Sequence, residues 1–203
     1  MIFLSQNVTK YCLIINTLLV LPLVFNIDYV LHVWLGEAPA YSSLFIIIVL
    51  VESYFNIMNQ MITVLVNATG NLKRNQLYGR TYTLLVLPIS YIVLLVVREP
   101  IIPMVLTVLG TLFYVSNNLY DVHLQVGVKI NIFLKEAVLP VCILNLSLVI
   151  ALSIIALFYN EGIYRLFLSM GVDLFLGIFI VYFYLLKSEE KLYVKTKIYQ
   201  LLK

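Results

Sequence analysis

Long apolar stretches separated by short polar connectors run along almost the whole of this sequence. The hydrocarbon core of a bilayer is roughly 30 Å thick, and a helix needs about 20 predominantly apolar residues to cross it. Successive stretches approach this length, and each is bounded by charges, Pro or Gly. The pattern predicts six transmembrane helices, over residues 11–34, 44–67, 82–97, 101–123, 137–158 and 164–186.

The composition supports an all-α membrane protein. Hydrophobic residues make up 63% of the 203 positions and charged residues 11%, which is far from the usual balance of soluble globular domains. The six predicted spans occupy nearly all of residues 1–186, so we expect a single six-helix transmembrane lobe. Any function must then be carried by helix faces within the membrane or by the loops and tail at its surfaces.

The distribution of Lys and Arg predicts how the helices are oriented. Cytoplasmic loops of membrane proteins retain positive charge. The segments that connect the six spans lie alternately on the two sides of the membrane, and the two sides differ greatly in their number of Lys and Arg residues. Only Arg98 and Arg165 fall on one side. The other side holds Lys10, Lys73, Arg74, Arg80, Lys129, Lys135, Lys187, Lys191, Lys195, Lys197 and Lys203. Both termini are therefore predicted to be cytoplasmic, and residues 187–203 form a basic tail attracted to anionic lipid.

Two predicted helices carry polar residues along one face. At 100° per residue, the polar positions of the second span fall within an arc of about 100° and those of the fourth span within about 80°. The first set is Glu52, Asn56, Asn59, Gln60, Thr63 and Asn67. The second set is Thr107, Thr111, Tyr114, Asn118, Asp121 and Gln125. Ionised groups are unfavourable in hydrocarbon, so both faces are predicted to look into a bundle or a wet cavity.

Two interpretations of these polar faces remain open. They line a shared aqueous cavity, or they form a hydrogen-bonded seam between helices. Asp173 in the sixth span is a further ionisable group at membrane depth, for which Arg165 is one candidate partner. The candidate cavity-lining residues are Glu52, Asn56, Asn59, Gln60, Thr63, Thr111, Asn118, Asp121 and Asp173.

Residue patterns of catalysis or metal binding are scarce. The two histidines, His32 and His123, have no spacing to carboxylates that indicates a metal site or an acid–base pair. Cys12 and Cys142 lie in apolar stretches without metal-type spacing and are interpreted as buried small residues. We expect no enzyme activity, catalytic residue, metal, cofactor or nucleic-acid partner.

Three segments resemble the C-terminal half of bacterial lipid-linked oligosaccharide flippases. These are polysaccharide and O-antigen exporters related to multidrug and toxin extrusion (MATE) transporters. The segments are residues 34–42 (WLGEAPAYS), 67–76 (NATGNLKRNQ) and 87–91 (LPISY). The resemblance implies one lobe of a MATE-like transporter in the bacterial inner membrane, whose partners are the bilayer and a lipid-linked oligosaccharide.

Members of that family are about twice as long and place two helical lobes around a central cavity. This chain resembles only the second lobe, so the resemblance implies a truncated product, one half of a split transporter, or a half-size unit that dimerises. Each functional form requires a second lobe as partner. A non-transporting membrane subunit is an alternative, and so is a membrane-embedded transferase with Glu52 or Asp121 as base.

The predicted topology can be tested with reporters. A cytoplasm-active reporter fused to the C-terminus is expected to be active, because basic residues cluster on that side. The same reporter inserted between Trp34 and Tyr41 is expected to be inactive. The reversed pattern of activity would overturn the six-span topology.

Overall fold

The computed structural model describes residues 2–71, 73–186 and 191, and these are helical with short connections and no strand. All of the predicted basic tail except Lys191 lies outside the described residues. The helices are α1 (Ile2–Phe25), α2 (Ile27–Leu35), α3 (Ser42–Ala68), α4 (Lys73–Val97), α5 (Ile102–Val126), α6 (Ile130–Phe133), η1 (Leu134–Val138), α7 (Leu139–Phe158), α8 (Ile163–Ile180) and η2 (Val181–Leu185). The segments η1 and η2 are π-helical turns that continue their neighbours.

Among the residues that the structure describes, five helices are long and apolar enough to cross a bilayer, judged by length and composition. They are α1, α3, α5, the continuous helix Ile130–Phe158 and the helix Ile163–Leu185. The remaining predicted span falls within α4, where the apolar part is the shorter stretch Leu84–Val97. These helices indicate a multi-pass membrane protein.

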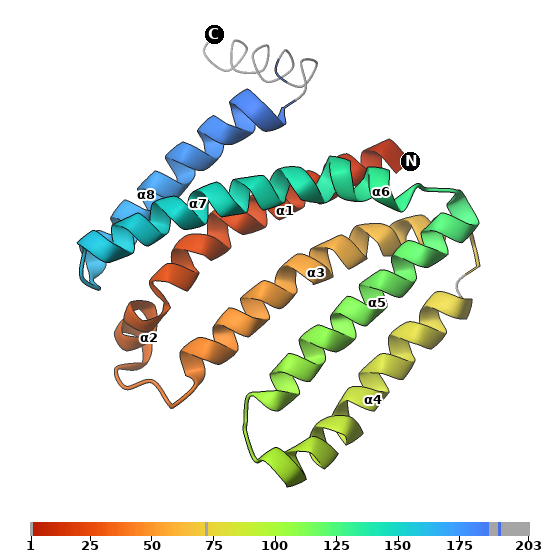
Figure 1. The fold of residues 1–203 in the computed structure, drawn as a ribbon, viewed down its shortest axis with the longest axis horizontal. Coiled ribbons are helices and arrows are strands. Elements are labelled where there is room, and N and C mark those ends of the chain that lie inside the picture. Colours follow the sequence, from red (N-terminus) through yellow and green to blue (C-terminus); the bar gives the residue numbers. More distant parts are fainter. Residues whose placement is uncertain (1, 72, 187–190, 192–203) are drawn as a thin grey trace.

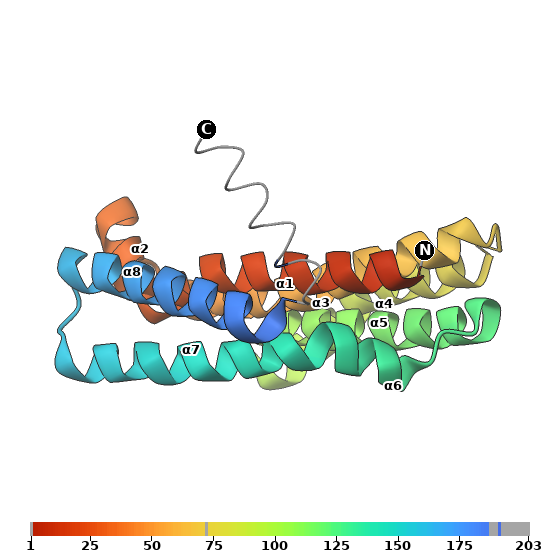
Figure 2. The same ribbon diagram turned by 90° about the horizontal axis from the view of Figure 1, so that it is seen from above.

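The helices lie side by side in one array (Figure 1). From one edge to the other, α8, α7 and α1 are followed by α3, α5 and α4, and α4 packs along α5. In the perpendicular view, α6 and α7 lie on one face of the array, across from α1 (Figure 2). This arrangement leaves α4 at one edge of the molecule.

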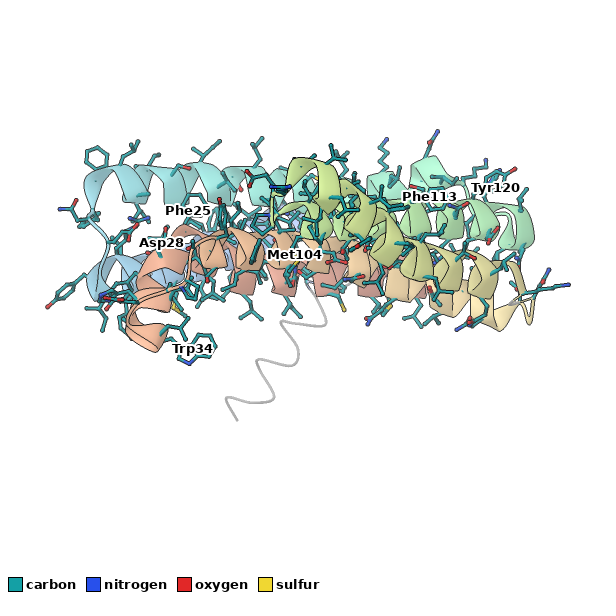
Figure 3. All side chains as sticks on the ribbon, turned by 90° about the horizontal axis from the view of Figure 1, so that it is seen from below. Phe25, Asp28, Trp34, Met104, Phe113 and Tyr120 are labelled. Atoms are coloured by element: carbon teal, nitrogen blue, oxygen red, sulfur yellow. The ribbon has the colours of Figure 1, made fainter. Side chains whose placement is uncertain are left out.

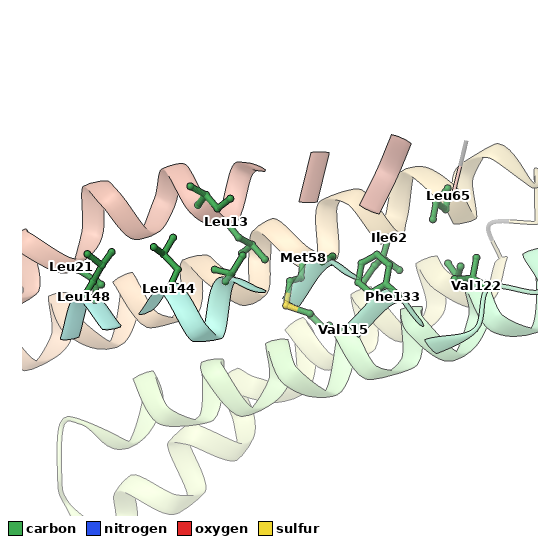
Figure 4. Packing of buried hydrophobic residues seen from close by; sticks show 14 of the residues in the cluster. Leu13, Leu21, Met58, Ile62, Leu65, Val115, Val122, Phe133, Leu144 and Leu148 are labelled. Carbon is green, nitrogen blue, oxygen red and sulfur yellow. The ribbon is translucent and has the colours of Figure 1, made fainter. Parts of the chain in front are cut away.

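A continuous apolar core joins the two halves of the array. Leu13 of α1, Ile62 of α3 and Phe133 of α6 are at most 2% exposed, and Leu144 and Leu148 of α7 are fully buried (Figure 4). In a bilayer such contacts stabilise the fold through close packing rather than by removing apolar surface from water. The core therefore fixes α1, α3 and α7 relative to one another.

Large apolar side chains cover much of the outer surface. Val96 of α4 and Leu157 of α7 are 80% and 83% exposed, as suits helices surrounded by lipid. Trp34 at the end of α2 is 76% exposed and points away from the helices (Figure 3). Cys142 is also exposed and Cys12 is half-buried, so the interpretation of both cysteines as buried is wrong.

The first predicted span, residues 11–34, is two helices rather than one. The chain breaks at Asn26, whose side-chain amide donates to the Pro22 carbonyl and to Ser169 Oγ, both at 2.8 Å. Arg165 Nη2 donates to the Phe25 carbonyl at 2.6 Å. Side chains of α8 thus bond to the Phe25 carbonyl and to the Asn26 amide N–H, whereas Asn26 Oδ1 has no hydrogen-bond partner among the described residues.

The beginning of α1 also differs from the prediction. The helix starts at Ile2, so Lys10, predicted to lie in a flanking segment, is inside it and only 3% exposed. Lys10 Nζ donates to the Leu185 carbonyl in η2 at 3.0 Å. The π-helical end of the last helix therefore provides an acceptor for a lysine that hydropathy alone places outside the first membrane span.

Reciprocal contacts between glycine and tyrosine hold α4 against α5. Tyr82 of α4 lies over Gly110, where an added Cβ would come within 2.7 Å of the ring. Tyr114 of α5 lies over Gly79 in the same way, with an added Cβ 2.8 Å from its ring. The two tyrosine rings stack with centroids 5.4 Å apart. Close approach of these helices thus depends on the absence of side chains at both glycines.

We expect Gly110→Ala to destabilise the packing of α4 on α5, since the added methyl overlaps the Tyr82 ring. Overpacking of this kind lowers the free energy of unfolding by about 1–3 kcal/mol. Gly171→Ala in α8 is the matched control, because an added Cβ there meets nothing within 4 Å. Steric-trapping measurements in bicelles compare the two variants, and equal stabilities would contradict the proposed close contact.

Candidate functional site

Hydrogen bonds between polar side chains join α3 and α5 along their length. Thr111 Oγ1 donates to Glu52 Oε1 at 2.7 Å. About two helical turns further along, Asn118 Nδ2 donates to Asn59 Oδ1 and, at 3.3 Å, to Thr63 Oγ1. Polar residues from the two predicted faces therefore meet each other directly.

The same seam continues to the ends of both helices. Thr69, at the end of α3, donates to Gln125 Oε1 at 2.6 Å. On α5 the bonded residues Thr111, Asn118 and Gln125 recur every seven positions, about two turns, which keeps them on one side of the helix. Thr111 and Asn118 are 1% and 0% exposed, so these side chains pack between helices.

Another part of the polar face of α3 is exposed. Asn56 and Gln60 lie near the middle of the helix and point away from the buried positions. Next to this face, Asn16 of α1 donates to Ser53 Oγ of α3 at 3.0 Å, and both residues are half-buried. The predicted lining residues of α3 are thus divided between a bonded seam and an open polar surface.

The two candidate aspartates lie in different places. Asp121 is 1% exposed on α5, one turn beyond Asn118. Asp173 is fully buried on α8, a helix that packs against α1 and α7. Asp173 therefore does not belong to the seam between α3 and α5.

The suggested pairing of Asp173 with Arg165 is wrong. Arg165 donates to the Phe25 carbonyl, and its Nη1 lies 3.9 Å from Glu161 Oε1. Within the described residues, neither carboxylate oxygen of Asp173 has a hydrogen-bond partner. Arg165 instead bonds to the Phe25 carbonyl, which the break between α1 and α2 leaves free. The spacing of Arg165 and Asp173 in the sequence does not show that this acceptor is nearby.

A second polar cluster was not predicted from the sequence. Tyr54 Oη of α3 donates to Thr17 Oγ1 of α1 and lies at the same distance, 3.3 Å, from Asn145 Oδ1 of α7. Each of these residues stands in an apolar stretch without the repeated spacing of the seam. Their meeting depends on how three helices pack, for which the sequence contains no local signal.

The residues considered for a transferase do not converge. Glu52 bonds to Thr111, and Asp121 lies ten residues further along α5, or about 15 Å at 1.5 Å per residue. His123 Nδ1 is hydrogen-bonded to the Val128 carbonyl at 2.9 Å. Among the described residues, no group of three or more His, Cys, Asp or Glu side chains is placed to hold a metal ion.

Comparison of the chain with protein-family models, curated proteins and solved structures found no match. The helices themselves indicate the class, a multi-pass α-helical membrane protein.

Asn118→Ala is expected to weaken the seam, because it removes the donor to Asn59 and Thr63. Interhelical hydrogen bonds in membranes contribute about 0.6 kcal/mol on average and up to about 1.7. Asn117→Ala is the control, since that side chain donates to the Phe113 carbonyl of its own helix. Steric trapping should show a larger loss of stability for Asn118→Ala, whereas identical losses would exclude a stabilising seam.

Proposed function

We propose that this chain is one lobe of a transporter that moves a lipid-linked oligosaccharide across the bacterial inner membrane. The three sequence segments that resemble oligosaccharide flippases supply the substrate class. If α4 is counted as a span, the lobe has six transmembrane helices and both termini on the same side, which the charge distribution predicts to be the cytoplasm.

The observation that carries the proposal is the exposure of Asn56 and Gln60 near the middle of α3. Amide groups that lose water without gaining hydrogen bonds are unfavourable by a few kcal/mol. A lipid-facing position is therefore a poor one for either side chain. A sugar-binding, water-filled pathway suits these groups, since amides both donate to and accept from hydroxyls.

A second lobe is required to enclose such a pathway. The array of Figure 1 forms a wall, with α3 in its middle and the half-buried Glu52 beside the exposed amides. Two lobes with an even number of spans would be parallel repeats about an axis along the membrane normal. Another copy of this chain, or a separate polypeptide, supplies the opposing wall.

A non-transporting membrane subunit is the second candidate. The hydrogen bonds of Glu52 with Thr111 and of Asn59 with Asn118 favour it, because they give these polar residues a structural role. The exposed amides Asn56 and Gln60 distinguish the two functions, since a subunit without a pathway has no need of them in an open position.

Reconstitution in vesicles tests the transport function directly. The purified chain is combined with a labelled lipid-linked oligosaccharide, either alone or with a related first lobe, and movement between leaflets is followed. We expect movement only when a second lobe is present. Replacing both Asn56 and Gln60 with Ala should slow it by tenfold or more, whereas Val64→Ala, on an exposed apolar position of the same helix, should not.

Two outcomes would contradict the proposal in different ways. Movement of the lipid by a strictly monomeric chain would show that one lobe suffices. If the lipid does not move in either preparation, with or without the related first lobe, while the chain remains folded, the non-transporting subunit would be favoured.

A further inference from the structure

The corner between α5 and α6 is a tightly built turn. Gly127 ends α5 with φ +73°, a conformation that favours glycine, and its N–H donates to the His123 carbonyl at 3.1 Å. Val128 is 5% exposed and belongs to the apolar core. Its carbonyl accepts a hydrogen bond from His123 Nδ1 at 2.9 Å. The turn therefore holds the His123 ring in one orientation.

A cavity of about 340 Å³ lies at this corner. Lys129 contributes a positive charge, His123 an imidazole ring, Asn131 an amide, and Ile130 and Ile132 apolar side chains. The segment between His123 and Cys142 contains one carboxylate, Glu136, which does not line the cavity. The cavity is thus suited to an anion.

A shallow groove of about 450 Å³ continues from Asn131, which lines both hollows. The π-helical turn η1 widens the helix here, and the groove runs past it. Its other lining residues are Leu134, Lys135, Val138, Leu139 and Cys142. The groove is therefore basic near its beginning and apolar towards Cys142.

The length of the groove matches one leaflet of a bilayer. Asn131 and Cys142 are eleven residues apart, or about 16 Å at 1.5 Å per residue. This is about half of the 30 Å hydrocarbon thickness. A cavity lined by Lys129 and an adjoining groove that is mostly apolar together fit the head group and one acyl chain of a single lipid molecule.

We propose that the corner between α5 and α6 binds one anionic phospholipid of the surrounding leaflet. The phosphate lies in the cavity beside Lys129, and one acyl chain follows the groove from Leu134 to Cys142. Charge complementarity selects this occupant, because basic pockets between membrane helices bind anionic head groups. Lys129 and Lys135 both lie on the side predicted to be cytoplasmic, where anionic lipids are found. The inference does not depend on the transport function.

Cys142 provides a probe within the groove. In a Cys12→Ala variant it is the sole thiol, since the chain has two cysteines, and it can carry a small fluorophore such as bimane. The labelled protein is placed in nanodiscs of phosphatidylcholine that contain either brominated phosphatidylglycerol or brominated phosphatidylcholine at the same mole fraction. Bromine quenches on contact, so we expect several-fold stronger apparent binding of the anionic lipid.

Charge variants show whether the pocket is responsible. Lys129→Gln and Lys135→Gln should each reduce the preference for phosphatidylglycerol by about fivefold. Lys73→Gln is the matched control, because it removes the same charge from the start of α4, outside the pocket. Circular dichroism and gel filtration verify that all variants remain folded.

Either of two results would overturn the lipid site. Equal quenching by the two brominated lipids in the parent protein would show that the groove has no preference for anionic lipid. An equal loss of preference in Lys73→Gln and Lys129→Gln would show that general surface charge, rather than the pocket, attracts the lipid.

Discussion

The pairing of polar side chains between α3 and α5 is the interaction on which much of the molecule depends. Inside a bilayer a polar side chain needs a partner from protein or water. Thr111 and Asn118 find theirs on α3, and this fixes α5 in place. Through α5 the seam also positions α4, which packs along it at the edge, and the turn that leads into α6. A change in this one interface would therefore be expected to shift α4 and α5 together relative to α3.

The sequence predicted the all-helical class and the approximate place of most long helices, because long apolar stretches leave the chain few alternatives. The polar face of α3 and that of α5 were also visible, since their periodicity is a property of single helices. The choice between an aqueous cavity and a bonded seam was not, because it depends on where the neighbouring helix lies. Asn56 and Asn59 look alike in sequence, yet the structure exposes one and bonds the other.

Other features depend on contacts between distant parts of the chain. The break at Asn26 is stabilised by Arg165 and Ser169, which follow about 140 residues later. Hydropathy treats α1 and α2 as one stretch for this reason. The location of Asp173 beside α1 and α7, and the cluster around Tyr54, likewise follow from packing. A local pattern contains no information about such contacts.

The π-helical turn η1 sets the rotational register of everything that follows it. Such a turn accommodates one residue more than an α-helical turn, so the surplus residue rotates the rest of the helix by about 100°. With η1 in place, Leu144, Leu148 and Leu152 of α7 all face the core. Loss of a single residue within η1 would rotate these leucines away from the core and bring polar Asn145 and Ser153 into the positions of Leu144 and Leu152. The extra residue in η1 therefore sets the rotation of α7 about its axis, so that the basic corner before η1 and the buried leucines after it both face the correct direction.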